Sequence, residues 1–247
     1  MSQYFDDTIN VLWSQIMHSM SGNDRYLCEI YLASATQKHL FAERRLRSLR
    51  GKITEYKRKS SRIDEHTRSR NYPNRLPIEM DFDHCILSLR SSLEHLAQLV
   101  NAVICLGIPA TGYHESVSLQ RVISKLDKET LVQGYSCLSN LSLYLSKVKN
   151  SNWYKELHAL RIESFHVKFG RLPRTETMTL GRDLIDLKFL LPNGTVTSKT
   201  TEIDRDIFVY CKSIVKDVER VLNNSFQYLS EYLLSKFGDK WLKDSTD

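Results

Sequence analysis

One apolar seam constrains the fold of this chain more than any other feature. It covers about residues 78–106, and its members alternate spacings of four and three: Phe82, Ile86, Leu89, Leu93, Leu96, Val100 and Val103. That alternation places every member on one face of an α-helix, which has about 3.6 residues per turn. A long helix with one apolar face must bury that face against other elements, so the seam predicts a helical bundle.

Helices are also expected over most of the remaining chain. Only 9 Gly and 5 Pro occur in 247 residues, and long uninterrupted stretches favour helices. The patterns predict helices over about 3–20, 24–68, 116–126, 129–148 and 203–237, with one more that begins near residues 150–152 and continues past Arg161. Gly107 and Pro109 are expected to end the seam helix, and Gly238 to end the last one.

The second expected helix changes character along its length. Its early part carries Leu27, Ile30, Tyr31 and Leu40, whereas its later part is mostly Arg and Lys with few apolar anchors. The later part is therefore predicted to leave the core as an arm. This divides the chain into N-terminal helices with a basic arm at 1–77 and a helical bundle at 78–247.

One segment has the residue pattern of β-strands. Residues 184–191 and 195–200 flank Pro192-Asn193-Gly194, and Asn-Gly between such runs predicts a β-hairpin at about 184–200. The predicted fold is all-α: an antiparallel helical bundle with a small β-hairpin inserted before the last helix and a long basic N-terminal helical arm.

Composition excludes several classes of protein. Charged residues at 26% and hydrophobic residues at 41% are typical of folded globular proteins. No apolar run approaches the roughly 20 residues of a membrane span, and the acidic start is unlike a signal peptide, so no membrane partner is expected. The five cysteines are scattered without a Cys-x-x-Cys pair, which argues against zinc and redox motifs. A cytoplasmic location is expected.

Positive charge is concentrated in one segment. From Lys38 to Arg75 there are thirteen Lys or Arg against four Asp or Glu, a local charge of +9; because the whole chain carries +6, the remainder carries −3. This asymmetry predicts an anionic partner, most simply nucleic acid, whose backbone the segment would follow. The solvated face of a long helix and the binding site of an acidic protein are the alternatives. The candidate RNA-binding residues are Arg44, Arg45, Arg47, Arg50, Lys57, Arg58 and Lys59.

The clearest chemical signal comes from Arg161 and His166. A His can move a proton and an Arg can stabilise charge on phosphorus, so the two together can cleave RNA without a metal ion. Five positions along a helix set side chains roughly 140° apart. A shared site would therefore need a bent helix or a second subunit. An exposed Arg and a partly buried His at a helix end are the plain structural alternative.

The order of these features resembles the HEPN (higher eukaryotes and prokaryotes nucleotide-binding) superfamily. The resemblance covers roughly residues 78–235 and rests on the seam helix with Arg90-Ser-Ser-Leu-Glu94-His-Leu, the helix ending in Leu160-Arg161-Ile-Glu-Ser-Phe-His166, and the long last helix. It implies a helical bundle with an Arg-x(4–6)-His motif. It also implies a metal-independent endoribonuclease, often a toxin or phage-defence effector, that dimerises so that two motifs share one cleft.

The resemblance also implies roles for single residues. Arg161 would stabilise the phosphate and His166 would act as general base or acid, with Glu94, Glu163 and His158 as possible supporting residues. No cofactor or metal is expected. The implied partners are RNA, a second copy of the chain and an antitoxin-like protein. The residue after the Arg is often polar in this family, and Ile162 here favours the alternative, a non-catalytic RNA- or protein-binding module of the same fold.

A di-iron site is the other chemistry that the sequence suggests. Glu163 and His166 form one Glu-x-x-His step, and Asp81 with His84 is a distant partner for it. A di-iron bundle needs two such steps and two further carboxylates on facing helices. Only one true Glu-x-x-His is present, so this interpretation is disfavoured.

Overall fold

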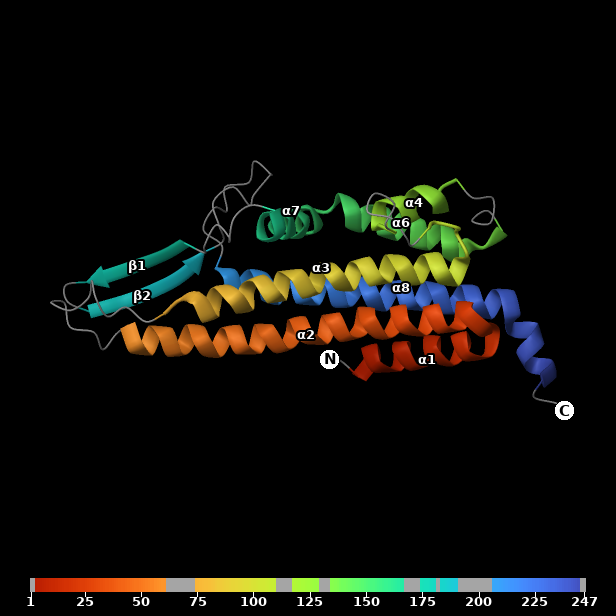
Figure 1. Ribbon diagram of the computed structural model, residues 1–247, viewed down its shortest axis with the longest axis horizontal. Coiled ribbons are helices and arrows are strands. Elements are labelled where there is room, and N and C mark those ends of the chain that lie inside the picture. Colours follow the sequence, from red (N-terminus) through yellow and green to blue (C-terminus); the bar gives the residue numbers. More distant parts are fainter. Residues whose placement is uncertain are drawn as a thin grey trace. The chain divides into compact units, whose positions relative to one another are not determined.

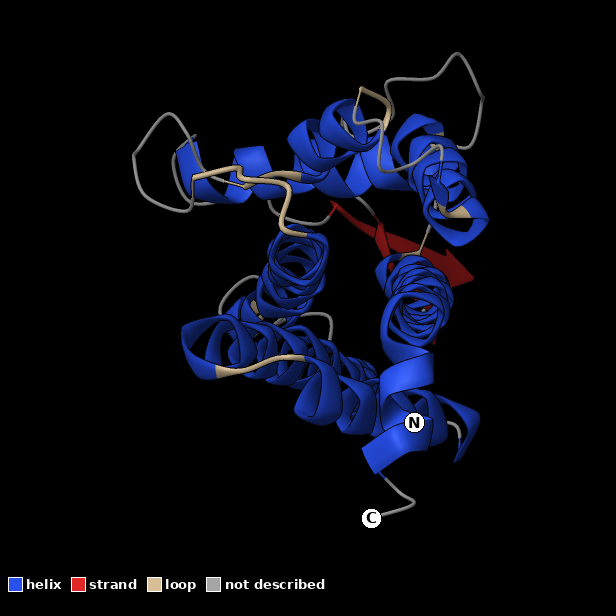
Figure 2. Ribbon diagram, turned by 90° about the vertical axis from the view of Figure 1, so that its right-hand side faces the viewer, coloured by secondary structure: helices blue, strands red, loops and turns tan. Residues whose placement is uncertain are grey.

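The computed structural model describes residues 3–60, 74–109, 117–128, 134–166, 174–180, 183–190 and 206–244. Helices dominate this part of the chain, and one strand pair accompanies them (Figure 2). The elements in chain order are α1 (Gln3–Ser19), α2 (Gly22–Ser60), α3 (Leu76–Ile104), α4 (Leu119–Leu126), α6 (Ser136–Asn150), α7 (Asn152–His166), β1 (Arg174–Leu180), β2 (Asp183–Leu190) and α8 (Ile207–Asp244) (Figure 1). The expected all-α class is confirmed.

The chain divides into two compact units. The first unit comprises Met1–Leu40, Ser91–Ser151 and Asp217–Asp247, and the second comprises Phe41–Arg90 and Asn152–Lys216. Three long helices, α2, α3 and α8, contribute residues to both units. This division differs from the boundary expected at residue 77.

The α3 seam is buried along its full length. Phe82, Ile86 and Leu89 are at most 3% exposed in the second unit, and the four later members are equally buried in the first. The helix ends where the chain adopts left-handed backbone at Cys105 (φ 61°) and Gly107 (φ 67°). The predicted seam helix and its stop at Gly107 are therefore confirmed.

Helix α2 buries a different face from the one expected. In the first unit the inward side chains are Cys28, Leu32, Ala35 and His39, whereas Ile30 is 38% exposed. Small residues allow close approach of the backbones, and Ser92 Oγ of α3 donates a hydrogen bond of 2.7 Å to the Ala35 carbonyl. A search for large apolar side chains finds only Leu32 of these four, because Cys28 and Ala35 are small and His39 is polar.

The basic half of α2 is not an arm. Leu49, Ile53 and Tyr56 are 0%, 9% and 6% exposed, so they anchor this half in the second unit. Together with Ala42 and the half-buried Leu46 they repeat the same four-and-three spacing that the α3 seam shows. Cys85 of α3 donates to the Ala42 carbonyl at 3.7 Å, which places the two helices side by side there. A narrow apolar seam is therefore enough to anchor this half of α2, although its other faces are strongly basic.

Strands β1 and β2 form an antiparallel pair (Figure 1). Arg174 lies opposite Leu190 and Leu180 lies opposite Asp183, with an irregularity between Met178 and Thr179. The expected hairpin at about 184–200 is not the pairing observed, because Asp183–Leu190 pairs with the preceding segment. Residues 195–200, its expected partner, lie outside the described part of the chain.

The last helix extends beyond its expected end. Helix α8 continues through Gly238 to Asp244, so the stop predicted at Gly238 is wrong. A glycine ends a helix when it takes up left-handed backbone, and Gly238 does not do so. Helix α8 carries a seam with spacings of four and three: Ile207, Cys211, Ile214, Val218, Val221, Ser225, Tyr228 and Tyr232. Seven of these residues are buried, and Tyr228 is half-buried.

Among the described helices, none combines the length and the apolar character that a membrane span requires.

Candidate functional site

Helix α7 is anchored in the second unit by a buried arginine. Arg90 Nη1 of α3 donates a hydrogen bond of 2.5 Å to the Tyr154 hydroxyl, and the guanidinium carbon lies 5.1 Å from the centre of the Tyr154 ring. Both side chains are less than 9% exposed. A buried hydrogen bond to a charged donor contributes about 1.5–3 kcal/mol, so this contact holds α7 against α3.

The inner face of α7 includes Tyr154 rather than its neighbour Trp153. Tyr154, Leu157 and Leu160 are buried, whereas Trp153 is only half-buried. Tyr154, Leu157 and Arg161 follow each other at spacings of three and four, so Arg161 lies on the same stripe, one turn beyond Leu157. Arg161 is half-buried. The helix therefore carries a partly accessible guanidinium next to its packed face.

The two members of the Arg-x4-His motif belong to one helix. Helix α7 reaches from Asn152 to His166, so positions 161 and 166 share its axis. The side chains of Glu163 and His166 lie outside the described part of the structure. Of the possible supporting residues, His158 is exposed on α7, and Glu94 is half-buried and belongs to the first unit.

Arg45 and Lys52 share a buried carboxylate. Asp81, which is 1% exposed, lies 2.7 Å from Lys52 Nζ and 3.2 Å from Arg45 Nη1. Burial alone would raise the pKa of Asp81, but the contacts from Lys52, Ser48 and Arg45 outweigh it and lower the pKa below its usual range. Asp81 therefore joins α2 to α3 in the second unit. This use of both oxygens by cations is also unlike the metal ligand that a di-iron site would require.

Four arginines form an exposed face on the basic half of α2. This arginine face consists of Arg44, Arg47, Arg50 and Arg58, all exposed. It surrounds Gly51 and Thr54, and the hollow between Arg47 and Arg58 has a volume of about 580 Å³. The guanidinium of Arg44 lies 5.9 Å from the Phe41 ring centre, and Arg47 lies 3.6 Å from Glu43.

The other basic candidates have different surroundings. Lys59 pairs with Glu55 at 2.7 Å, and hydrogen bonding from Lys59 lowers the pKa of Glu55. Lys57 is half-buried. Together with Arg45 at Asp81, these contacts leave the arginine face as the most accessible group of positive charges within the described residues 38–60. Of the seven candidate RNA-binding residues, Arg45 therefore stabilises the contact between α2 and α3, and four others form the exposed arginine face.

Sequence reasoning missed three groups in this unit. Lys52 was part of the basic run but was not distinguished from it, and its contact with Asp81 joins residues far apart in the chain. The Arg90–Tyr154 contact joins residues 64 positions apart. The pocket beside Tyr56, described below, also depends on two helices. Of these three groups, only Arg90 could have been suspected from the sequence, because it directly follows Leu89 of the α3 seam. A charged side chain beside a buried face needs a partner.

Comparison with known proteins gives no match. No family model matches this chain, and neither the curated proteins nor the solved structures that were compared contain a similar protein.

Proposed function

We propose that this protein binds RNA through the arginine face of α2 and cleaves it, without a metal ion, at Arg161 and His166. The observation that carries the proposal is the composition of the second unit. It contains the arginine face and also helix α7, on which a half-buried Arg161 follows a packed stripe held by Arg90. Exposed guanidinium groups suit phosphate, because they bind its oxygens in pairs.

The proposed reaction is a transesterification. His166 takes the proton of the RNA 2′-hydroxyl, whose oxygen attacks the adjacent phosphorus while Arg161 stabilises the charge that builds on the non-bridging oxygens. The bond to the 5′-oxygen breaks, and the imidazole of a second subunit protonates that oxygen. The products are a 2′,3′-cyclic phosphate and a 5′-hydroxyl. A DNA strand lacks the attacking hydroxyl and would not react.

A cleavage assay in EDTA tests the proposal. Wild-type protein should cleave single-stranded RNA and leave cyclic-phosphate ends, whereas His166→Ala should lower the rate by about 100- to 10,000-fold, the usual contribution of general acid–base catalysis. Arg161→Lys should also be slow, because it keeps the charge but loses the paired hydrogen bonds. His18→Ala, at an exposed histidine of α1 in the first unit, is the matched control. Equal rates for His166→Ala and wild type would contradict the proposal.

A toxin or phage-defence role is the biological form of this proposal. Expression of the wild-type chain should then arrest growth, and His166→Ala should relieve the arrest. An acidic antitoxin-like protein would be expected to bind the arginine face and compete with RNA.

A non-catalytic RNA-binding module is the second candidate. The arginine face and Ile162 favour it, since binding needs no catalytic pair. Replacing Arg47 and Arg50 with Gln should weaken RNA binding, whereas the same change at Lys212 and Lys216, exposed on α8 in the same unit, removes equal charge and should have less effect. RNA binding without cleavage by a folded protein would support this candidate over the first.

A further inference from the structure

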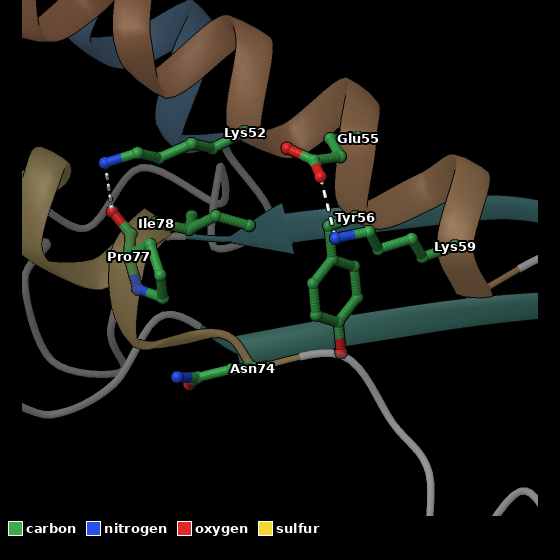
Figure 3. A pocket seen from close by; sticks show the side chains of 7 residues that line it. All are labelled: Lys52, Glu55, Tyr56, Lys59, Asn74, Pro77 and Ile78. Carbon is green, nitrogen blue, oxygen red and sulfur yellow. Dashed lines mark hydrogen bonds and ion pairs between the residues drawn. The ribbon is translucent and has the colours of Figure 1, made fainter.

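A pocket opens between the last turns of α2 and the first turn of α3, within the second unit (Figure 3). Its volume is about 230 Å³. Lys52, Tyr56 and Lys59 line it from α2, where spacings of four and three place them on one face. Asn74, Pro77 and Ile78 line it from the start of α3. The pocket therefore exists only because the two helices meet there.

The pocket combines an apolar wall with a polar rim. Tyr56, Pro77 and Ile78 supply the wall, and Tyr56 and Ile78 are at most 6% exposed. Asn74 is exposed at the rim, and its Oδ1 accepts a hydrogen bond of 2.9 Å from the Leu76 N–H. Because Asn74 Oδ1 faces the Leu76 N–H, the two N–H donors of the Asn74 amide lie on the opposite side of the amide group. A flat ring with acceptor atoms on its edge matches this combination.

The charge around the pocket favours an anionic ligand. Lys52 donates to the Pro77 carbonyl at 3.2 Å and also pairs with Asp81, to which Arg45 is bound as well. Two cations therefore share one carboxylate, which leaves a net positive charge beside the pocket. At the rim, Lys59 has a side chain that is 56% exposed and pairs with Glu55 (Figure 3).

Size and position narrow the ligand further. A cavity of 230 Å³ lies below the roughly 300–1,000 Å³ of pockets that hold whole drug-sized molecules, so it suits one ring system. Glu55 lines both this pocket and the hollow of the arginine face, so the two adjoin. A phosphodiester backbone on the arginine face would therefore carry its bases past the mouth of the pocket.

We propose that this pocket binds one unstacked base of single-stranded RNA whose backbone lies on the arginine face. The inference rests on the proposed RNA binding and narrows its substrate class. A base in a duplex is stacked and paired and cannot enter, whereas single strands present bases that aromatic and apolar side chains can hold. Asn74 would donate to the edge of the base, and Tyr56 with Pro77 would cover its faces.

A strand without bases separates the contribution of the bases to binding from that of the backbone. Binding of a fluorescent decauridylate is compared, by anisotropy, with that of a decamer of equal charge whose sugars carry no bases; both strands carry 2′-O-methyl groups, so that they lack the attacking hydroxyl and are not cleaved. Stacking contributes about 1–3 kcal/mol per base, so the base-containing strand should bind about 5- to 150-fold more tightly. Tyr56→Leu should remove most of that difference, whereas Tyr26→Leu, at an exposed tyrosine near the start of α2 in the first unit, should preserve it.

Asn74→Asp gives a second test that does not depend on the buried ring. Aspartate keeps the oxygen that caps Leu76 but replaces the amide donors with an acceptor, so the helix start should persist while base-dependent binding falls at least 5-fold. Thermal melting identifies any variant that fails to fold.

The outcomes distinguish this inference from the function on which it rests. Base binding in the pocket would be contradicted if wild type bound the two strands equally, or if both pocket variants retained the base-dependent difference. RNA binding by the arginine face would still stand in either case. Failure of wild type to bind either strand would overturn both. A difference that is lost in Tyr56→Leu and in Asn74→Asp, but kept in Tyr26→Leu, is the expected result.

Discussion

At the scale of single residues, burial decides which cysteines can react. Burial raises the pKa of Cys28 to about 12, with smaller contributions from Cys105, Asp24 and Glu29, and it also raises the pKa of Cys137. The pKa of Cys211 is raised by burial and by contact with the Cys85 thiol. Only Cys105, in left-handed backbone at the end of α3, is exposed. The scattered positions of the five cysteines in the sequence do not distinguish Cys105 from the four buried ones.

Thiol labelling should therefore modify one cysteine in the native protein. A maleimide at pH 7 is expected to add once per chain, because the reactive form is the thiolate and burial both hides and suppresses it elsewhere. Intact mass measures the number of adducts. Cys105→Ser should give none, and labelling in guanidinium chloride should give five with the wild type. Rapid native labelling at a second site would contradict the burial described here.

Asp81 links α2 to α3 in the second unit through its ion pairs with Lys52 and Arg45. Asp81→Asn should lower the free energy of unfolding by about 1–3 kcal/mol at pH 7, because it removes the charge that Lys52 and Arg45 share. Since its folded pKa is lowered, this stabilisation is present above the unfolded pKa of about 3.9 and is lost as the pH falls through the folded value. Urea unfolding measures the free energy of unfolding of wild type and of Asp81→Asn. The difference between the two proteins should be smaller near pH 3 than at pH 7.

Asp217 is the matched control for that measurement. Burial raises its pKa despite Arg220 nearby, so its charged form does not stabilise the fold. Asp217→Asn should accordingly be neutral or slightly stabilising at pH 7. A difference between wild type and Asp81→Asn that grows in acid would show that Asp81 is not held charged by its partners.

At the scale of elements, α2 shows how one helix can serve two environments. Its inward positions alternate four and three from Cys28 to Tyr56, and all of them are buried except the half-buried Leu46. The basic half also presents the arginine face to solvent. Gly51 lies in the middle of that exposed face, and a Cβ there would meet nothing within 4 Å. Packing therefore does not require this glycine, which weakens the helix for no steric reason.

Gly51→Ala should stabilise the protein. Alanine in an exposed helix interior is favoured over glycine by about 0.5–1 kcal/mol, so the urea midpoint should rise. Gly107→Ala is the opposite control: its φ of +67° is strained for alanine, so that variant should lose stability even though its Cβ also meets nothing within 4 Å. A destabilised Gly51→Ala would mean that this helix is not continuous through residue 51.

At the scale of the whole molecule, the proposed site lies within one unit but needs two chains. The second unit contains Arg161, the arginine face and the pocket beside Tyr56. Positions 161 and 166 on α7 are separated by about 140° around the axis of a regular helix. One α7 therefore does not direct both groups at the same phosphate, and a second copy is the simplest way to complete the site.

A homodimer is accordingly predicted. Light scattering at micromolar concentration should give a mass near twice the 28.8 kDa of the chain. Mixing His166→Ala with wild type should then lower the rate per wild-type chain, because the proposed reaction uses an imidazole from each subunit and a mixed dimer keeps only one. Cleavage by a protein that remains monomeric would exclude the shared site and would require a bent α7.

The sequence by itself determined the positions of most helices. The seams of α3 and α8 and the stop at Gly107 follow from local spacing and backbone preference, which need no knowledge of the partner helix. The expected end at Gly238 failed because glycine permits left-handed backbone without enforcing it. The strand at Asp183–Leu190 was found, but its partner was not, since either neighbouring segment can supply backbone hydrogen bonds.

Only the tertiary structure decided which surfaces face each other. Whether the basic half of α2 leaves the core depended on Leu49, Ile53 and Tyr56 finding apolar neighbours, and spacing alone does not reveal those neighbours. Arg45 looked like its exposed neighbours until Asp81, 36 residues away, was seen beside it. Periodicity is a property of one helix, whereas a buried ion pair or a pocket arises from two helices that meet, and so it cannot be read from either one.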